Sequence, residues 1–310
     1  MPHSPIIEIR DYQMKFGPTT VIADLSFEVH EGETFAFLGS NGSGKTTTIR
    51  TLLGIYEPTA GELLVRGRRY SPKMSAMLGY LPEERGLYKK ESVLDTMLYF
   101  GRLKRMTRPA AERWSRDYLE RVGLADKTNV ALDKLSGGQQ QKIQLGVTIM
   151  NDPQLMILDE PTKGFDPVNR RLLMEILEEH QARGATVVLV THQMEEVERL
   201  CDRVILLKDG RRRLYGTVEE IRASHGVPVI DVEFNGSFPK TSRHFEVKQL
   251  GKRSAELTLA QGAAPQLVLE ELVGYAKLSL TSFQLRQSSL DDIFVALYDE
   301  PGRRAQEVAA

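Results

Sequence analysis

The stretch Gly39-Ser-Asn-Gly-Ser-Gly-Lys-Thr-Thr47 constrains this chain more than any other part of its sequence. It matches the pattern G-x-x-x-x-G-K-[ST], in which glycines let consecutive backbone N–H groups approach one phosphate and the following helix adds its N-terminal dipole. The lysine of this pattern reaches the β- and γ-phosphates, and the hydroxyl after it ligates Mg²⁺. We expect phosphate contacts from Gly39, Ser40, Asn41, Gly42, Ser43, Gly44, Lys45, Thr46 and Thr47, with Thr46 also on the metal and Lys45 assisting catalysis.

The residues on either side of this loop predict the structural context that it needs. Residues 33–38 form a short apolar run suited to a buried strand, and residues 47–53 carry apolar side chains at helical spacing. A dinucleotide-binding fold is disfavoured because its G-x-G-x-x-G spacing is not matched by glycines at 39, 42 and 44. A glycine-rich turn that binds nothing is the remaining alternative, and the strand and helix disfavour it. The loop is therefore predicted to bind a nucleoside triphosphate.

Composition excludes several other classes of function. The 310 residues suffice for one large domain and a smaller one, and the net charge of −1 provides no field that would attract nucleic acid or anionic lipid. The single cysteine, Cys201, rules out an internal disulfide and a multi-thiolate metal site, and we expect a buried structural thiol. No apolar run approaches the length of a membrane span, and the first residues lack the pattern of a signal peptide. These features favour a cytosolic protein.

Hydrophobic periodicity predicts an α/β fold for the first two thirds of the chain. Residues 6–38 alternate apolar and polar in two runs, which indicates an antiparallel lead-in, and residues 91–123 have helical spacing. Further buried strands are expected at 155–160, 185–190 and 203–207, the last followed by a hairpin. Phe16 and Tyr12 are candidates for stacking on a base, although ordinary packing explains either aromatic ring nearly as well.

Two of these predicted strands end in side chains that suit phosphate chemistry. Asp159 and Glu160 end the run from Leu155, and His192 follows the strand at 185–190. Ligands of parallel α/β folds bind at the carboxyl edge of the sheet, so we expect these three side chains to meet there. Asp159 would hold Mg²⁺, Glu160 would polarise the attacking water and His192 would contact the γ-phosphate. A solvated acidic turn is the alternative for the two carboxylates.

A second candidate anion site lies about 90 residues beyond Lys45. Ser136, Gly137, Gly138 and Gln139 lead into a helix that we expect to begin near Gln140. A serine hydroxyl, approachable backbone and a helix N-terminus together favour an anion. A plain helix cap with loop glycines is the alternative reading of the same residues.

The sequence changes character near residue 222. Alternating runs at 229–234, 244–248 and 255–259, a helix at 264–274, a strand at 277–283 and a final helix at 293–298 predict a small α+β domain over 222–300. Ser289 and Asp292 have the spacing of a capping box, with an aspartate in place of the usual glutamate. Residues 301–310 are predicted to be a disordered tail, and no catalytic chemistry is evident in this region.

Together these motifs resemble the ATP-binding cassette family, the ATPase subunits of ABC transporters. The resemblance spans residues 7–217 and rests on the phosphate loop, Leu135–Gln139, Leu155–Glu160, the turn Gly164-Phe-Asp166 and His192. It implies a P-loop NTPase cassette over 1–221, with a RecA-like mixed sheet, an antiparallel β lead-in and a helical insert at about 84–150. It also implies ATP and Mg²⁺ as ligands, adenine stacking by Phe16, and a nucleotide contact by Asp166.

The same resemblance implies how the cassette assembles. ATP would lie between the phosphate loop of one subunit and Ser136–Gln139 of another, in a head-to-tail dimer with itself or with a paralogous cassette. Two departures from the family pattern stand out. Glu83 replaces the usual glutamine, which places another carboxylate among the expected nucleotide and metal contacts, and Phe165 replaces a commoner leucine.

The run Gly79–Tyr88 and the C-terminal Ser288–Phe294 are similar to a narrower group, the ATPases of ABC-2-type exporters, including sodium-efflux and drug-export systems. This similarity implies an ATP-hydrolysing exporter subunit at the cytoplasmic face of the membrane, held there by a polytopic permease, with no nucleic acid as partner. The alternative is a soluble cassette ATPase acting on nucleic acid or the ribosome. An importer ATPase is a third reading, which the mixed α/β pattern after residue 222 disfavours. The transported substrate, the identity of the permease, the role of residues 222–310 and the effect of Glu83 are not determined by the sequence.

Overall fold

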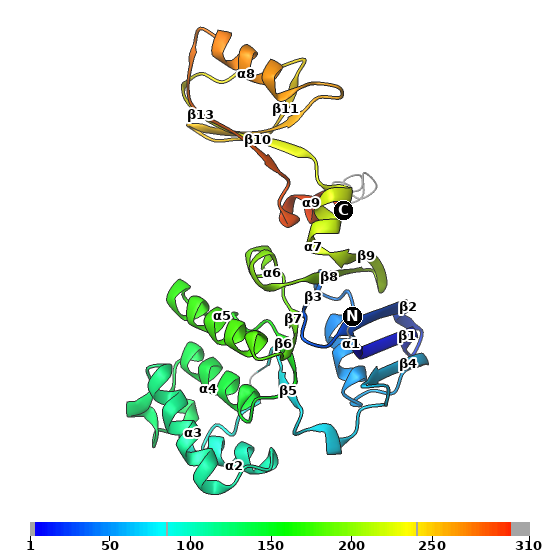
Figure 1. Cartoon of the computed structure of the whole chain (residues 1–310), viewed down its shortest axis with the longest axis vertical. Helices are drawn as coiled ribbons and strands as arrows, with labels where there is room; N and C mark the ends of the chain where they lie inside the picture. The colour runs from blue at the N-terminus through cyan, green and yellow to red at the C-terminus, as the bar shows by residue number, and fades with distance from the viewer. Residues whose placement is uncertain (1–3, 85, 240, 299–310) are drawn as a thin grey trace. The chain divides into compact units, whose positions relative to one another are not determined.

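Buried parallel strands form the centre of the first part of the chain (Figure 1). The computed structural model describes residues 4–84, 86–239 and 241–298. These residues divide into two units, one ending at Val218 and the other beginning at Glu219, close to the change in composition near residue 222. The predicted tail at 301–310 lies outside the described residues.

Nine strands of the described part of the first unit make one sheet in the order β4-β1-β2-β9-β8-β3-β7-β6-β5. They are β1 (Pro5–Phe16), β2 (Thr19–His30), β3 (Thr34–Gly39), β4 (Ala60–Val65), β5 (Leu78–Leu81), β6 (Leu155–Asp159), β7 (Thr186–Val190), β8 (Arg203–Lys208) and β9 (Arg211–Thr217). Strands β8, β3, β7, β6 and β5 run parallel, whereas β1 pairs antiparallel with both β2 and β4. The predicted mixed sheet with an antiparallel lead-in is confirmed.

The central strands are buried on both faces, which explains their continuous apolar sequences. Along β6, Met156 and Leu158 pack into a cluster with the helices of the insert, whereas Leu155 and Ile157 pack into a second cluster with β1, β2 and α1 (Lys45–Leu52). Every residue of β6 and β7 is therefore buried. Burial on two faces holds the ends of these strands rigidly in place.

The predicted helical insert lies between β5 and β6 and contains three α-helices in the described part of the chain. They are α2 (Val93–Leu103), α3 (Arg108–Arg121) and α4 (Gly137–Ile149). The helices α5 (Pro167–Ala182), α6 (Met194–Leu200) and α7 (Val218–His225) follow later. Helix α4 begins three residues before the expected start near Gln140, because the Ser136 side chain accepts a hydrogen bond from a backbone N–H group of its first turn, and Asp166 caps α5 in the same way.

The second unit confirms the predicted α+β pattern. Its described strands form an antiparallel sheet in the order β11-β12-β10-β13, and helix α8 contributes Val268 and Leu272 to the core on one face of that sheet. The Ser289–Asp292 capping box is present in both directions, at 2.8 and 3.1 Å. The elements are β10 (Pro228–Gly236), β11 (Phe245–Leu250), β12 (Ser254–Leu259), α8 (Pro265–Gly274), β13 (Leu278–Gln287) and α9 (Leu290–Tyr298).

Helix length and hydropathy bear on how the chain could meet a membrane. Among the residues described, there is no helix with both the length and the apolar character that crossing a bilayer requires.

The contact between α3 and α4 generates a test of packing in the insert. A Cβ atom on Gly146 would lie 2.4 Å from a carbon of the Tyr118 ring, which itself stacks on Trp114. We expect Gly146→Ala to lower the free energy of unfolding by roughly 1–3 kcal/mol, since the ring and its neighbours must shift. Urea unfolding followed by circular dichroism measures the change. Gly86→Ala is the matched control, because a Cβ there meets nothing within 4 Å; equal stability of the two variants would contradict the prediction.

Candidate nucleotide site

The phosphate loop connects β3 to α1, and its glycines are required by its geometry. Gly44 has a φ of 107° immediately before α1, and a Cβ atom there would lie 2.3 Å from Ile22 Cδ1. Gly39 has a φ of 156°, and a Cβ atom on it would lie 2.5 Å from the Leu207 carbonyl oxygen. Side chains at either position would push the loop away from the neighbouring strands. The loop therefore holds its backbone N–H groups at the N-terminus of α1.

Lys45 is the first residue of α1 and lies over its own loop. Its Nζ donates hydrogen bonds to the carbonyl oxygens of Gly39 at 2.8 Å and Ser40 at 3.1 Å. Burial lowers the pKa of this ammonium from its ordinary value, while the nearby carboxylates of Glu160 and Asp159 act in the opposite direction. The ammonium is thus positioned beside the loop in which phosphate oxygens would bind.

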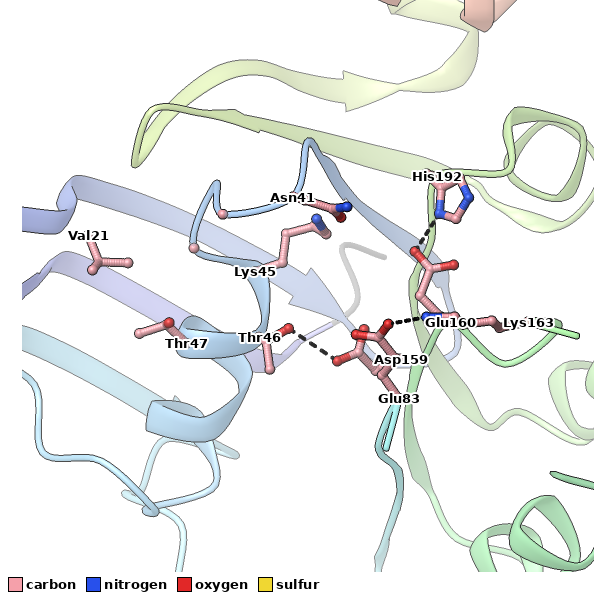
Figure 2. Close-up of a pocket in the computed structure, with 12 residues that line it drawn as sticks. Val21, Asn41, Lys45, Thr46, Thr47, Glu83, Asp159, Glu160, Lys163 and His192 are labelled. Carbon is pink, nitrogen blue, oxygen red and sulfur yellow. Dashed lines mark hydrogen bonds and ion pairs between the residues drawn. The ribbon is translucent and has the colours of Figure 1, made fainter. Parts of the chain in front are cut away.

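Thr46 and Asp159 approach each other across this loop (Figure 2). Thr46 Oγ1 donates to Asp159 Oδ2 at 3.4 Å, and Asp159 is only 2% exposed. Burial, followed by the charges of Glu83 and Glu160, raises the pKa of Asp159 to about 6. A hydroxyl and a carboxylate are ligands that suit Mg²⁺, and a cation here would offset the clustered negative charge.

The protein's own ligands for such a cation would be few. Among the described residues, no three His, Cys, Asp or Glu side chains converge as a metal-binding group. Mg²⁺ in phosphate sites is commonly held by one or two protein ligands together with phosphate oxygens and water. The Thr46–Asp159 pair fits that mode of binding.

Glu160 follows β6 directly and adopts an uncommon backbone conformation. Its φ is 48°, and its N–H donates to the Val190 carbonyl at 2.8 Å, which ties it to the end of β7. A left-handed glutamate costs about 1–3 kcal/mol, and such strain concentrates at functional sites. This conformation directs the carboxylate toward His192, whose Nδ1 lies 2.7 Å from Glu160 Oε1 (Figure 2).

These residues line one cavity of about 540 Å³. The structure brings together most of the expected phosphate loop with Glu83, Asp159, Glu160 and His192, as predicted for the carboxyl edge of the sheet. Two lining residues were not predicted from the sequence, Val21 and Lys163. The lining consists of Val21, Asn41, Gly42, Gly44, Lys45, Thr46, Thr47, Glu83, Asp159, Glu160, Lys163 and His192.

Glu83 reaches this cavity with a partner that the sequence did not indicate. Lys163 Nζ donates to Glu83 Oε1 at 2.6 Å, and both side chains are substantially exposed. An exposed ion pair of this kind contributes little to stability. It nevertheless places a cation opposite the carboxylate that stands where the family usually has glutamine. A lysine three residues after Glu160 was the only available signal, and its partner is 80 residues away.

The other predicted anion site does not line this cavity. Ser136 Oγ accepts a hydrogen bond from Gln139 N–H at 3.3 Å, and Ser136 N–H donates to Gln139 Oε1 at 2.9 Å, so these residues cap α4. Asp166 likewise caps α5, where Oδ1 accepts from Asn169 N–H at 2.8 Å. Ser136 therefore caps α4, and the N-terminus of α4 lies outside the chain's own phosphate cavity, so contacts of Ser136–Gln139 and Asp166 with a nucleotide stay predictions.

The aromatic candidates differ in exposure. Tyr12 is fully buried, and its hydroxyl lies 2.8 Å from Thr51 Oγ1, so stacking of Tyr12 on a base is wrong. The strand β1 directs this ring into the core between the sheet and α1. Phe16 is 45% exposed and packs edge-on against Tyr56 with ring centroids 5.4 Å apart. It does not line the described cavity, so its contact with adenine stays a prediction.

Cys201 is the remaining residue singled out from the sequence. It is partly buried and packs against the hydrophobic cluster that includes Leu200. Burial raises the pKa of this thiol far above its ordinary value. The structural role expected for it agrees with this environment.

Comparison with known proteins identifies both units. The ABC transporter family model matches residues 22–163, and the model for the C-terminal domain of DrrA1-3-like ATP-binding proteins matches residues 216–298. An uncharacterized ABC transporter ATP-binding protein of Bacillus subtilis is 35% identical over 90% of this chain and 94% of its own length. The Nod factor export ATP-binding protein I of Burkholderia lata is 34% identical over 99% of this chain and its entire length.

A solved structure of an ATP-binding subunit of an ABC transporter has the same cassette. It superposes with a TM-score of 0.66 at 29% identity, over 70% of this chain and 92% of the other. The expected family and fold class are thus confirmed, and members of this family hydrolyse ATP. The chain belongs to the ATP-binding subunits of ABC transporters and is an ATPase.

Proposed function

We propose that this chain works as a head-to-tail dimer that binds Mg·ATP at two composite sites and drives export through a separate membrane permease. The main support for a dimer is that the phosphate loop and the N-terminus of α4, the second predicted anion site, are separated in one chain. The phosphate loop lies in the cavity, whereas the N-terminus of α4 lies outside it. Two-fold pairing of identical chains would let each α4 complete the partner's site, and symmetry then creates two such sites.

Each side chain of the cavity has a distinct task in this proposal. Lys45 and the loop N–H groups bind the phosphates, while Thr46 and Asp159 hold Mg²⁺, which neutralises phosphate charge when bound. Glu160 accepts a hydrogen bond from the attacking water and orients it. His192, held by the Glu160 carboxylate at 2.7 Å, contacts the γ-phosphate oxygens. Positioning and charge compensation supply most of the rate in phosphoryl transfer.

Glu83 and Phe16 complete the proposed site. Glu83 lies near Asp159, where it adds negative charge, and Lys163 offsets part of that charge. We propose that Glu83 contacts the metal and the nucleotide. While its carboxylate is paired with Lys163, the contact would be made through a water molecule. Phe16 is assigned to the adenine base, because its exposed ring needs only a flat partner.

Export is favoured over the other functions that the sequence left open, namely import and a soluble role on nucleic acid or the ribosome. The Burkholderia lata relative, which aligns over its entire length, is named for Nod factor export, and the second unit matches the DrrA1-3-like C-terminal domain. ABC ATP-binding subunits work with a membrane permease component. We therefore place the chain at the cytoplasmic face of the membrane, bound to such a permease. A protein that acts on nucleic acid or the ribosome commonly carries an excess of positive charge, whereas the net charge of this chain is −1.

Replacement of the proposed base tests the chemistry. We expect Glu160→Gln to lower kcat of the purified ATPase by roughly 10²–10⁴-fold, because the amide cannot accept the water's proton. The same variant should bind ATP and accumulate as a dimer, measured by size-exclusion chromatography with Mg·ATP. Glu62→Gln is the control, since Glu62 is exposed on β4. Wild-type turnover by Glu160→Gln would refute the assignment of this base.

A mixture of two inactive variants tests the composite site. Lys45→Ala removes the phosphate contact and Ser136→Ala removes the hydroxyl at α4, so each homodimer has two damaged sites. A mixed dimer keeps one intact site, formed by the loop of the Ser136→Ala chain and the α4 end of the Lys45→Ala chain. An equal mixture should recover about a quarter of wild-type ATPase activity, since half the dimers are mixed and each keeps one site of two. Activity no higher than the mean of the two variants would contradict head-to-tail pairing.

A further inference from the structure

A buried carboxylate lies behind the two loops that carry Glu160 and His192. Glu196 is on α6, four residues after His192, and its side chain is only 3% exposed. Burial raises the pKa of this carboxyl from its ordinary value. Burying a carboxylate costs free energy unless it is paired or hydrogen-bonded, so the burial of Glu196 must be explained by its partners.

Two of these partners are threonine hydroxyls on the catalytic loops. Thr191 Oγ1 donates to Glu196 Oε2 at 3.5 Å, and the Thr162 side chain is near enough to act as a donor that lowers the pKa of the same carboxyl, against the effect of burial. Both threonines are almost completely buried, at 0% and 2% exposure. Thr162 is two residues after Glu160, and Thr191 directly precedes His192. One carboxylate therefore joins the loop of the proposed base to the loop of the histidine.

A third partner connects the same carboxylate to α5. Arg170 Nε lies 3.8 Å from Glu196 Oε1, and neither atom has a hydrogen-bond partner in the described part of the chain. Arg170 is in the first turn of α5, just after the Asp166 cap. The pair gains charge attraction without a direct hydrogen bond. A buried ion pair with this geometry is weak evidence for a contribution to stability. It is better explained by a role in keeping several segments aligned.

The loop is also held from the side of α4. Gln141 is 4% exposed on α4, and its Nε2 donates to the Pro161 carbonyl oxygen at 3.2 Å. Pro161 lies between Glu160 and Thr162, so the loop is fixed by α4 on one side and by Glu196 on the other. The Glu160–His192 contact depends on the relative position of these two loops, which follow the paired strands β6 and β7 and are also joined by the Glu160 N–H bond to Val190.

We propose that Glu196 is a positioning residue for ATP hydrolysis. Through Thr162 and Thr191, its carboxylate keeps Glu160 and His192 at the distance that orients water and γ-phosphate. Glu196 itself does not line the nucleotide cavity. This inference rests on the proposed roles of Glu160 and His192, and it adds a residue outside the cavity to them.

The test separates turnover from nucleotide binding in the full-length chain. We expect Glu196→Gln to lower kcat on the order of 10-fold or more, because small displacements of catalytic groups are costly, with KM for ATP changed by less than about twofold. Neither Glu196 nor its two threonine partners line the cavity that contains the phosphate loop and the Thr46–Asp159 pair. Glu195→Gln, an exposed neighbour on the same helix, is the matched control and should keep wild-type kcat and KM.

A double-mutant cycle distinguishes positioning from general destabilisation. Thr191→Val keeps the shape of the side chain but removes its hydroxyl, and it should lower kcat in the same manner. If the two residues act through one contact, the Glu196→Gln/Thr191→Val double variant loses less activity than the product of the single losses. Should Glu196→Gln fail to fold, Thr191→Val and Thr162→Val test the same network, and both must then lower kcat at constant KM.

Several outcomes would overturn the inference. Unchanged kcat in Glu196→Gln would do so, as would strictly multiplicative losses in the double variant. A decrease in activity that merely equals the fraction of protein unfolded, measured by urea unfolding, would show a structural role alone. Glu160→Gln separates the two proposals: full turnover there refutes the proposed function, whereas a dead Glu160→Gln beside a fully active Glu196→Gln refutes only the role of Glu196.

Discussion

The register of the parallel strands is the constraint on which the rest of the site depends. Phe37 of β3 pairs with Val190 of β7, and Val190 also pairs with Asp159 of β6. Three segments far apart in the sequence therefore end at one level of the sheet, where the phosphate loop, the acidic pair and His192 begin. Because these strands are buried on both faces, a slip of register would move apolar side chains out of both clusters.

The electrostatics of the cavity follow from this convergence. Burial, followed by the charges of Glu83 and Glu160, raises the pKa of Asp159, while the Lys45 ammonium acts in the opposite direction and Lys163 pairs with Glu83. Binding of a polyphosphate would add further negative charge. A divalent cation and the positive N-terminal end of the α1 dipole would balance it. The left-handed backbone of Glu160 costs free energy locally. The surrounding strands and the hydrogen bond to Val190 hold it in this conformation.

Buried polar side chains connect this cavity to the helices around it. Gln144 of α4 donates to the carbonyl oxygens of Pro82 and Glu84, on either side of Glu83, while Gln141 of the same helix holds Pro161. A displacement of α4 would thus reach both the Glu83 loop and the Glu160 loop. This arrangement gives a physical link between the helix end that the proposed dimer engages and the residues that we propose to act on the γ-phosphate. Each bond is inside the fold, where a lost partner leaves an unsatisfied group.

The sequence by itself determined the features that depend on neighbouring residues. The phosphate loop, the β1–β2 lead-in, the Ser136 cap and the Ser289–Asp292 capping box follow from local spacing, because turn geometry and helix caps involve residues a few positions apart. Only the tertiary structure decided that Tyr12 is buried, that Lys163 pairs with Glu83, and that Glu196 joins two loops. Those outcomes depend on which surfaces meet after the strands pair, and local sequence patterns do not report contacts between segments as distant as Glu83 and Lys163.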